Sequence, residues 1–279
     1  MVVPDATHQR PDASHQRRLA VITGAFGGIG GELAKQFAAH DFDLIVAADH
    51  PGIHDASRDL ATHGVRVQAV QVDLAEPSGV EALWGQILAA HRPVDAAAIN
   101  AGLAVYDLFA TENDLDAEIR LINRTVLASV YLARLLLPPM VQRGAGRILI
   151  TSVAAMPPGP YAAVYSASTA FLNSFVEAVR SELKGTGVTV TALVPDATDA
   201  PLFDKAVVAR QGFEALIAGT DHAAKGSTRD SLEDVTVRLP MPPAAPSGEG
   251  TTRERHLAAG TRTRARALGH WIHRRWWSR

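Results

Sequence analysis

A glycine-rich segment near the start of the chain has the composition of a turn that binds phosphate. Residues 23–30 read TGAFGGIG and directly follow a short apolar run, Leu19–Thr23. Glycine lets the backbone turn sharply and approach a ligand closely, and the first amides of a following helix attract anions. We therefore expect this turn to hold the pyrophosphate of a dinucleotide against the start of a helix.

Polar or turn-forming residues also come just after the other apolar runs of the chain. Asp49, Asp73 and Asn100 follow the second to fourth runs, and Ser152 and Pro195 follow the fifth and sixth. Each alone is more often a cap or turn residue. In an open parallel sheet, however, ligands bind at the carboxyl ends of the strands. The shared position of these residues therefore predicts a ligand site along one edge of a sheet.

The elements that position these residues alternate between short apolar runs and longer helical patterns. The predicted strands are Leu19–Thr23, Leu44–Ala47, Val65–Val72, Ala96–Asn100, Arg147–Thr151 and Thr189–Val194. The predicted helices are Gly30–Ala39, Asp55–Thr62, Ser78–His91, Asp114–Met140, Ala162–Lys184 and Lys205–Ala218. The strands are almost wholly apolar, as expected where helices cover both faces of a sheet. This alternation predicts an α/β fold, a doubly wound parallel sheet in a single domain.

Charge and composition divide the 279 residues into an acidic body between two polar tails. Residues 1–18, 19–227 and 228–279 carry net charges of +1, −8 and +5. The first tail repeats a polar heptapeptide and the last begins as a Pro-rich linker, so we expect both to lie outside the core, the first of them disordered. The chain has no cysteine, which excludes disulfides and thiolate metal sites. We expect a cytoplasmic protein without a membrane-spanning helix and without a metal.

The last fifteen residues, ARALGHWIHRRWWSR, combine arginine with three of the four tryptophans. A basic amphipathic helix of this composition could contact an anionic membrane surface or nucleic acid. An unstructured tail is the simpler interpretation and the one that we prefer, so no nucleic-acid partner is expected.

Several motifs in the expected order make residues 18–227 resemble the short-chain dehydrogenases/reductases, a family of tyrosine-dependent Rossmann oxidoreductases. TGAFGGIG matches the family's T-G-x-x-x-G-x-G turn, and Asn100-Ala101-Gly102 matches its N-A-G segment. Asp73-Leu74 matches the aspartate that supports the adenine ring. Asn123 matches the helical asparagine, and Ser152 stands 13 residues before Tyr165, which is the family's serine–tyrosine spacing.

The resemblance implies hydride transfer between a nicotinamide dinucleotide and the alcohol or carbonyl group of a small molecule. Ser152 would bind and polarise the substrate oxygen, Tyr165 would exchange its proton, and Asn123 would hold a water in the proton relay. The residues implied to bind the dinucleotide are Thr23, Gly24, Phe26, Gly28, Ile29, Gly30, Asp49, Asp73, Leu74, Asn100, Ala101, Gly102, Tyr165 and Pro195.

Three departures from the family pattern predict reduced activity. Position 169 is threonine where the family has a lysine that lowers the pKa of the tyrosine and binds the nicotinamide ribose. Thr169 can donate a hydrogen bond to a ribose hydroxyl but supplies no positive charge. Pro195-Asp196 replaces the family's Pro-Gly, and the ten residues Asp196–Lys205 make a short lid. An alternative that fits these departures is a dinucleotide-binding sensor or scaffold with little turnover.

The acidic residue after the second strand bears on the choice of cofactor. Asp49 favours NAD over NADP, because a carboxylate suits a free ribose 2′-hydroxyl better than a 2′-phosphate. Family members commonly pair through their long fourth and fifth helices, so the resemblance also implies a homo-oligomer.

Overall fold

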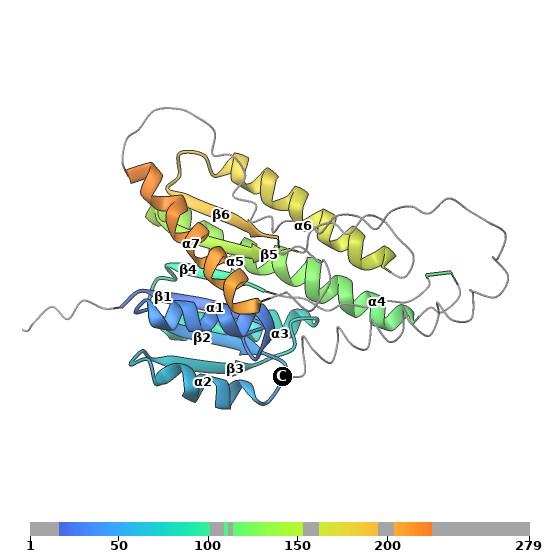
Figure 1. Cartoon of the computed structure of the whole chain (residues 1–279). Helices are drawn as coiled ribbons and strands as arrows, with labels where there is room; N and C mark the ends of the chain where they lie inside the picture. Colours follow the sequence, from blue (N-terminus) through green and yellow to red (C-terminus); the bar gives the residue numbers. More distant parts are fainter. Residues whose placement is uncertain (1–16, 101–108, 111–113, 153–161, 195–203, 225–279) are drawn as a thin grey trace, which may run out of the picture.

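Strands and helices alternate along the chain as the apolar pattern predicts (Figure 1). The computed structural model describes residues 17–100, 109–110, 114–152, 162–194 and 204–224. The strands are β1 (Leu19–Thr23), β2 (Asp43–Ala48), β3 (Val67–Gln71), β4 (Ala96–Ile99), β5 (Gly146–Thr151) and β6 (Val188–Leu193). The helices are α1 (Gly28–Ala39), α2 (Ile53–Ala61), α3 (Pro77–Ala89), α4 (Leu115–Ile122), α5 (Ala128–Arg143), α6 (Ala163–Glu182) and α7 (Lys205–Ala224). Most of the two tails predicted from the sequence lies outside the described residues.

The strands form one parallel sheet in the order β3-β2-β1-β4-β5-β6. The chain therefore starts in the middle of the sheet, builds outward to β3, and crosses back past β1 to build the other half. This order confirms the doubly wound parallel sheet predicted from the sequence. Because every strand runs the same way, the carboxyl ends of all of them meet at one edge.

Helices cover both faces of the sheet, which is why the strands are apolar on both sides. On one face, α1, α2 and α7 bury Leu33, Phe37 and Phe213 against alternate residues of β1 and β2. On the other face, α3, α5 and α6 bury Leu83, Leu132 and other side chains against the intervening residues.

One predicted helix, Asp114–Met140, is interrupted in the structure. A five-residue π-helical turn, η1 (Asn123–Leu127), joins α4 to α5, and the amide of Ala128 donates to the carbonyl oxygen of Asn123 across it. Turns of this kind occur often at functional sites, because the extra residue changes the direction of the side chains. Hydrophobic periodicity alone does not register a single inserted residue, so this turn was not predicted from the sequence.

The same helical stretch, Leu115–Arg143, is long and apolar enough to cross a membrane by length and composition alone, and 39% of its most apolar window is buried inside the protein. A core helix meets the same criterion. Here Leu132, Leu136 and Met140 pack against the sheet, which accounts for the apolar character of this stretch.

Candidate functional site

The glycine-rich turn between β1 and α1 is locked against the end of β4. Thr23 is buried, and its hydroxyl accepts a hydrogen bond from the amide of Asn100, with 3.0 Å between Oγ1 and N. A Cβ atom at Gly24, where φ is +64°, would lie 2.2 Å from the carbonyl oxygen of Asn100. One at Gly30 would lie 2.3 Å from the carbonyl oxygen of Gly24. Only glycine fits at these two positions, because the turn passes so close to its neighbours.

The first turn of α1 presents unshielded backbone amides beside this turn. Gly27 is the residue before the helix; it supplies no side-chain cap, and the first helical turn carries no acidic residue. Free amides and the positive end of the helix dipole favour a negatively charged group here. The side chain of Ile29, in contrast, is buried in the core below, so only its backbone faces the turn.

Phe26 packs on the turn that follows β2. Its ring stacks on His50, with ring centroids 3.9 Å apart and an interplanar angle of 12°. His50 Nδ1 in turn accepts a hydrogen bond from the amide of Gly52, 3.0 Å away. The glycine-rich turn and the β2–α2 connection are thereby held together next to Asp49.

Carboxylates at the ends of β2 and β3 share a cation from the helix opposite. Arg124, in η1, donates from Nη2 to Asp49 and to Asp73, the latter at 2.9 Å. Arg120, one turn earlier in α4, donates to the second oxygen of Asp73 at 2.6 Å. Burial raises the pKa of Asp73, but hydrogen bonds from Arg124, from the amide of Ala75 and from Arg120 outweigh it and lower the pKa to about 2.

At the other half of the edge, Ser152 lies against α6. Its hydroxyl is buried and donates to the carbonyl oxygen of Thr169, 3.2 Å away. Thr169 is 2% exposed, and its own hydroxyl donates to the carbonyl oxygen of Ser166 at 2.9 Å. Tyr165 stands one helical turn before Thr169 on α6, which packs against η1 and so against the turn that carries Asn123. The elements carrying Ser152, Tyr165 and Asn123 therefore meet.

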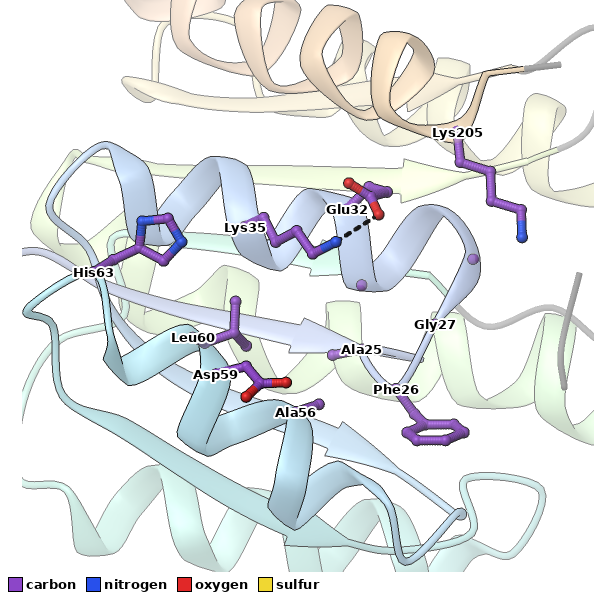
Figure 2. A pocket seen from close by; sticks show the side chains of 12 residues that line it. Ala25, Phe26, Gly27, Glu32, Lys35, Ala56, Asp59, Leu60, His63 and Lys205 are labelled. Atoms are coloured by element: carbon purple, nitrogen blue, oxygen red, sulfur yellow. Dashed lines mark hydrogen bonds and ion pairs between the residues drawn. The ribbon is translucent and has the colours of Figure 1, made fainter. Parts of the chain in front are cut away.

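A pocket of about 460 Å³ opens beside the glycine-rich turn, between α1 and α2 (Figure 2). Gly27 and Phe26 lie at one end of it, where the side chain of Lys205 extends from α7. Lys35 on α1, paired with Glu32 at 2.8 Å, and His63, just after the end of α2, lie farther from the turn. Within the described ranges, no group of three or more histidine, aspartate or glutamate side chains is placed to hold a metal ion.

Comparison with known proteins identifies the family to which the chain belongs. Residues 18–211 match the profile described as short chain dehydrogenase. The chain belongs to the short-chain dehydrogenase family.

Named relatives agree with this assignment. Ketoacyl reductase HetN of Nostoc sp. is 34% identical over 181 residues, which are 64% of this chain and 62% of that protein. The 1-deoxy-11-beta-hydroxypentalenate dehydrogenase of Streptomyces exfoliatus is 30% identical over 258 residues, covering 84% of this chain and 94% of that one. A crystal structure of a metagenomic short-chain oxidoreductase in complex with NADP has the same fold, with a TM-score of 0.66 at 23% identity, covering 81% of this chain and 98% of that chain.

In this short-chain dehydrogenase the structure adds two residues that the sequence interpretation missed, Arg120 and Arg124. They stand four residues apart on one helix face, in a helix expected beside strand ends that carry two aspartates. This spacing could have predicted that the two arginines pair with the aspartates. Among the expected binding residues, the side chain of Leu74 is buried in the core. Ala101, Gly102 and Pro195, together with Asp196, lie outside the described residues.

Proposed function

We propose that this short-chain dehydrogenase is an NAD(P)-dependent oxidoreductase that transfers a hydride between the nicotinamide and an alcohol or carbonyl carbon. The observation that carries the proposal is the glycine-rich turn. Gly24 and Gly30 pass so close to Asn100 that no side chain fits, and unshielded α1 amides follow directly. The relatives named as a reductase and a dehydrogenase, and the related oxidoreductase crystallised with NADP, support the same reaction class.

The residues present fit a dinucleotide along the carboxyl edge of the sheet. The turn from Thr23 to Gly30 would hold the pyrophosphate, Asp49 the adenosine ribose and Asp73-Leu74 the adenine. Asn100-Ala101-Gly102, Tyr165 and Pro195 would line the path toward the nicotinamide. When bound, the nicotinamide supplies the hydride acceptor or donor.

The protein's own groups would handle the substrate oxygen and its proton. In the oxidative direction Ser152 binds the hydroxyl oxygen, Tyr165 takes the hydroxyl proton as the hydride leaves the carbon, and a carbonyl forms. In the reductive direction Tyr165 returns a proton to the oxygen. Asn123 holds a water that carries the proton onward. Because a tyrosine has an ordinary pKa of about 10, it is a poor base near neutrality without a nearby cation.

The lack of such a cation at Thr169 is why we propose low turnover. The Thr169 hydroxyl already donates to the Ser166 carbonyl oxygen within the helix, so its single donor is in use. This observation also favours the second candidate function, a dinucleotide-binding protein with little catalysis. In that case Ser152 and Tyr165 would persist without turning over substrate.

One experiment separates these two functions. Nicotinamide oxidation and reduction are measured over a panel of alcohols and carbonyls for the full chain and for Thr169→Lys, and both dinucleotides are titrated on the same samples. Turnover by the unmodified protein supports the oxidoreductase. Binding with turnover only in the lysine variant supports the second candidate. If both variants fail to bind either dinucleotide, both candidates are wrong.

We further propose that the protein pairs with copies of itself through α4, η1 and α6. Exposed apolar side chains gather on these elements: Leu115, Ile119, Ile122, Leu127 and Phe171 are between 41% and 59% exposed. Phe171 also stacks on Phe175 with centroids 6.2 Å apart. An apolar face of this kind is typical of an interface rather than of a solvated surface.

A further inference from the structure

Arg124 connects two strand ends through one nitrogen atom. Its Nη2 donates both to Oδ2 of Asp49, after β2, and to Oδ1 of Asp73, after β3. The Arg124 side chain is only 16% exposed, whereas that of Asp49 is 49% exposed. The guanidinium is therefore held inside the edge of the sheet, and the Asp49 carboxylate is tethered to it from the solvent side.

The tether uses one oxygen of the Asp49 carboxylate. Within the described residues, Oδ2 is the carboxylate oxygen of Asp49 that accepts a hydrogen bond, and the side chain is 49% exposed, so Oδ1 is left to accept from a ligand. A carboxylate accepts hydrogen bonds and cannot donate them when ionised. Oδ1 is therefore suited to a hydroxyl donor and repels a phosphate.

The net charge of the residues around Asp49 also disfavours a phosphate. Asp49, Asp73 and Arg124 together carry a net charge of −1. Arg120 pairs with Asp73 and with Glu76, and the opposite charges of Arg120 and Glu76 leave that total unchanged. Because Arg124 is already shared by two carboxylates, its charge is largely compensated. A 2′-phosphate of about two negative charges would meet a site that is still negative, even though it contains two arginines.

We propose that Arg124 is a positioning residue that fixes the Asp49 carboxylate for the adenosine ribose hydroxyls and so sets a preference for NAD over NADP. The inference rests on the proposed dinucleotide-dependent function. Arg124 acts through Asp49: it holds one carboxylate oxygen and leaves the other in place. Without it, Asp49 and Asp73 lose the cation that they share, and mutual repulsion turns the exposed Asp49 side chain toward solvent.

Binding titrations test this, because they do not depend on turnover. Calorimetry with NAD and with NADP is run on the full chain and on Arg124→Gln, Asp49→Asn and the double variant. Arg134→Gln, an exposed arginine on α5, is the matched control, and melting temperatures are recorded for every sample. Arg124→Lys is the second variant: it keeps the charge, so it should retain the fold and partly rescue NAD affinity.

We expect the unmodified chain to bind NAD more tightly than NADP. Arg124→Gln should bind NAD about tenfold more weakly, the size of effect typical for a hydrogen bond to a charged group. Asp49→Asn should weaken NAD and strengthen NADP. In the Asp49→Asn background, Arg124→Gln should cost no further NAD affinity, a coupling that general destabilisation would not produce.

The outcomes that overturn the inference differ from those that overturn the function. Failure of the unmodified chain to bind either dinucleotide removes the proposed function. A chain that binds NADP more tightly than NAD removes only the inference. So does an Arg124→Gln variant that binds NAD as well as the parent, or better, since the guanidinium would then be idle or in the way. If Arg124→Gln does not fold, Asp49→Asn decides: a variant that binds NAD as tightly as the parent removes the inference.

Discussion

The hydroxyl of Ser152 donates to the carbonyl oxygen of Thr169, 3.2 Å away, and so ties the end of β5 to α6 one turn after Tyr165. The contact places position 169 next to the serine that would bind the substrate oxygen. Because the contact is made by the backbone of position 169, the residue there is held beside the proposed oxygen-binding serine and one helical turn from the proposed proton-exchanging tyrosine.

Replacing Thr169 with lysine should raise turnover. An ammonium one helical turn from Tyr165 lowers the pKa of the phenol, so more phenolate is present near neutral pH and alcohol oxidation is faster. If the cation contributes most of a pKa shift of about 3 units, the gain reaches up to about three decades. Steady-state oxidation rates between pH 6 and 10 check this. The rate increases with pH as the phenol ionises, and in the variant this increase should begin at a lower pH than in the parent.

Ala170→Lys is the matched control, because Ala170 is exposed on the adjacent position of the same helix. It should leave the rate and its pH dependence unchanged. Equal rates for Thr169→Lys and the parent, with both proteins folded, would count against a role for charge at this position.

Gly24→Ala and Gly30→Ala should each abolish dinucleotide binding and lower stability. Their Cβ atoms would lie 2.2 and 2.3 Å from backbone oxygens, so the turn must open. A loss of more than about 2 kcal/mol is expected from such crowding. Gly85→Ala in α3 is the control, since a Cβ there meets nothing within 4 Å. It should raise stability by about 0.5–1 kcal/mol, measured by urea unfolding, and leave binding unchanged.

Protonation of Asp73 should contribute to acid destabilisation. Its pKa is about 2 in the folded protein, against about 3.9 when unfolded, so it adds stability above pH 4 that is lost as the pH falls from about 4 to 2. Its side chain is 30% exposed, so solvent screening reduces the contribution to about 1 kcal/mol. In Asp73→Asn, unfolding free energy measured between pH 5 and 2 should fall less steeply. An unchanged slope would contradict this.

Asp43→Asn should destabilise the fold without affecting the site. Asp43 is 1% exposed at the opposite, amino edge of the sheet and accepts from Arg66 Nη2 at 2.7 Å and Arg92 Nη1 at 2.6 Å. Burial raises its pKa, but the hydrogen bonds from the two arginines outweigh it and lower the pKa. Loss of the charge removes the carboxylate that pairs with Arg92. It should lower the free energy of unfolding, measured with urea, by about 2–3 kcal/mol. A change in NAD affinity of the folded protein would be unexpected.

Ile119→Glu should dissociate the proposed assembly. Ile119 is 44% exposed in the middle of the apolar face on α4, and a carboxylate there would be buried in an interface. Light scattering coupled to gel filtration should show a smaller species. Leu88→Glu is the control, because Leu88 is 56% exposed but lies on α3, outside that face. A monomeric parent, or equal masses for all three proteins, would contradict the proposed interface.

Local pattern in the sequence determined the fold class, the order of the elements and the position of the glycine-rich turn. Apolar runs such as Leu19–Thr23 pack on both faces whatever their exact neighbours, so the strands and the starts of the helices were predicted to within a few residues. The helix predicted to end at Ala218 continues to Ala224. Polar residues at strand ends were placed on one edge for the same reason, because parallel strands bring their carboxyl ends together.

Tertiary structure alone decided which side chains meet at that edge. Arg124 lies 75 residues from Asp49 and 51 from Asp73 in the sequence, and the contact depends on how α4 and η1 lie over the strand ends. The π-helical turn at Asn123 rotates the following residues, and the Thr169 hydroxyl turns to the Ser166 carbonyl oxygen. Periodicity records which face of a helix is apolar; the helix's height and rotation against the sheet come only from packing.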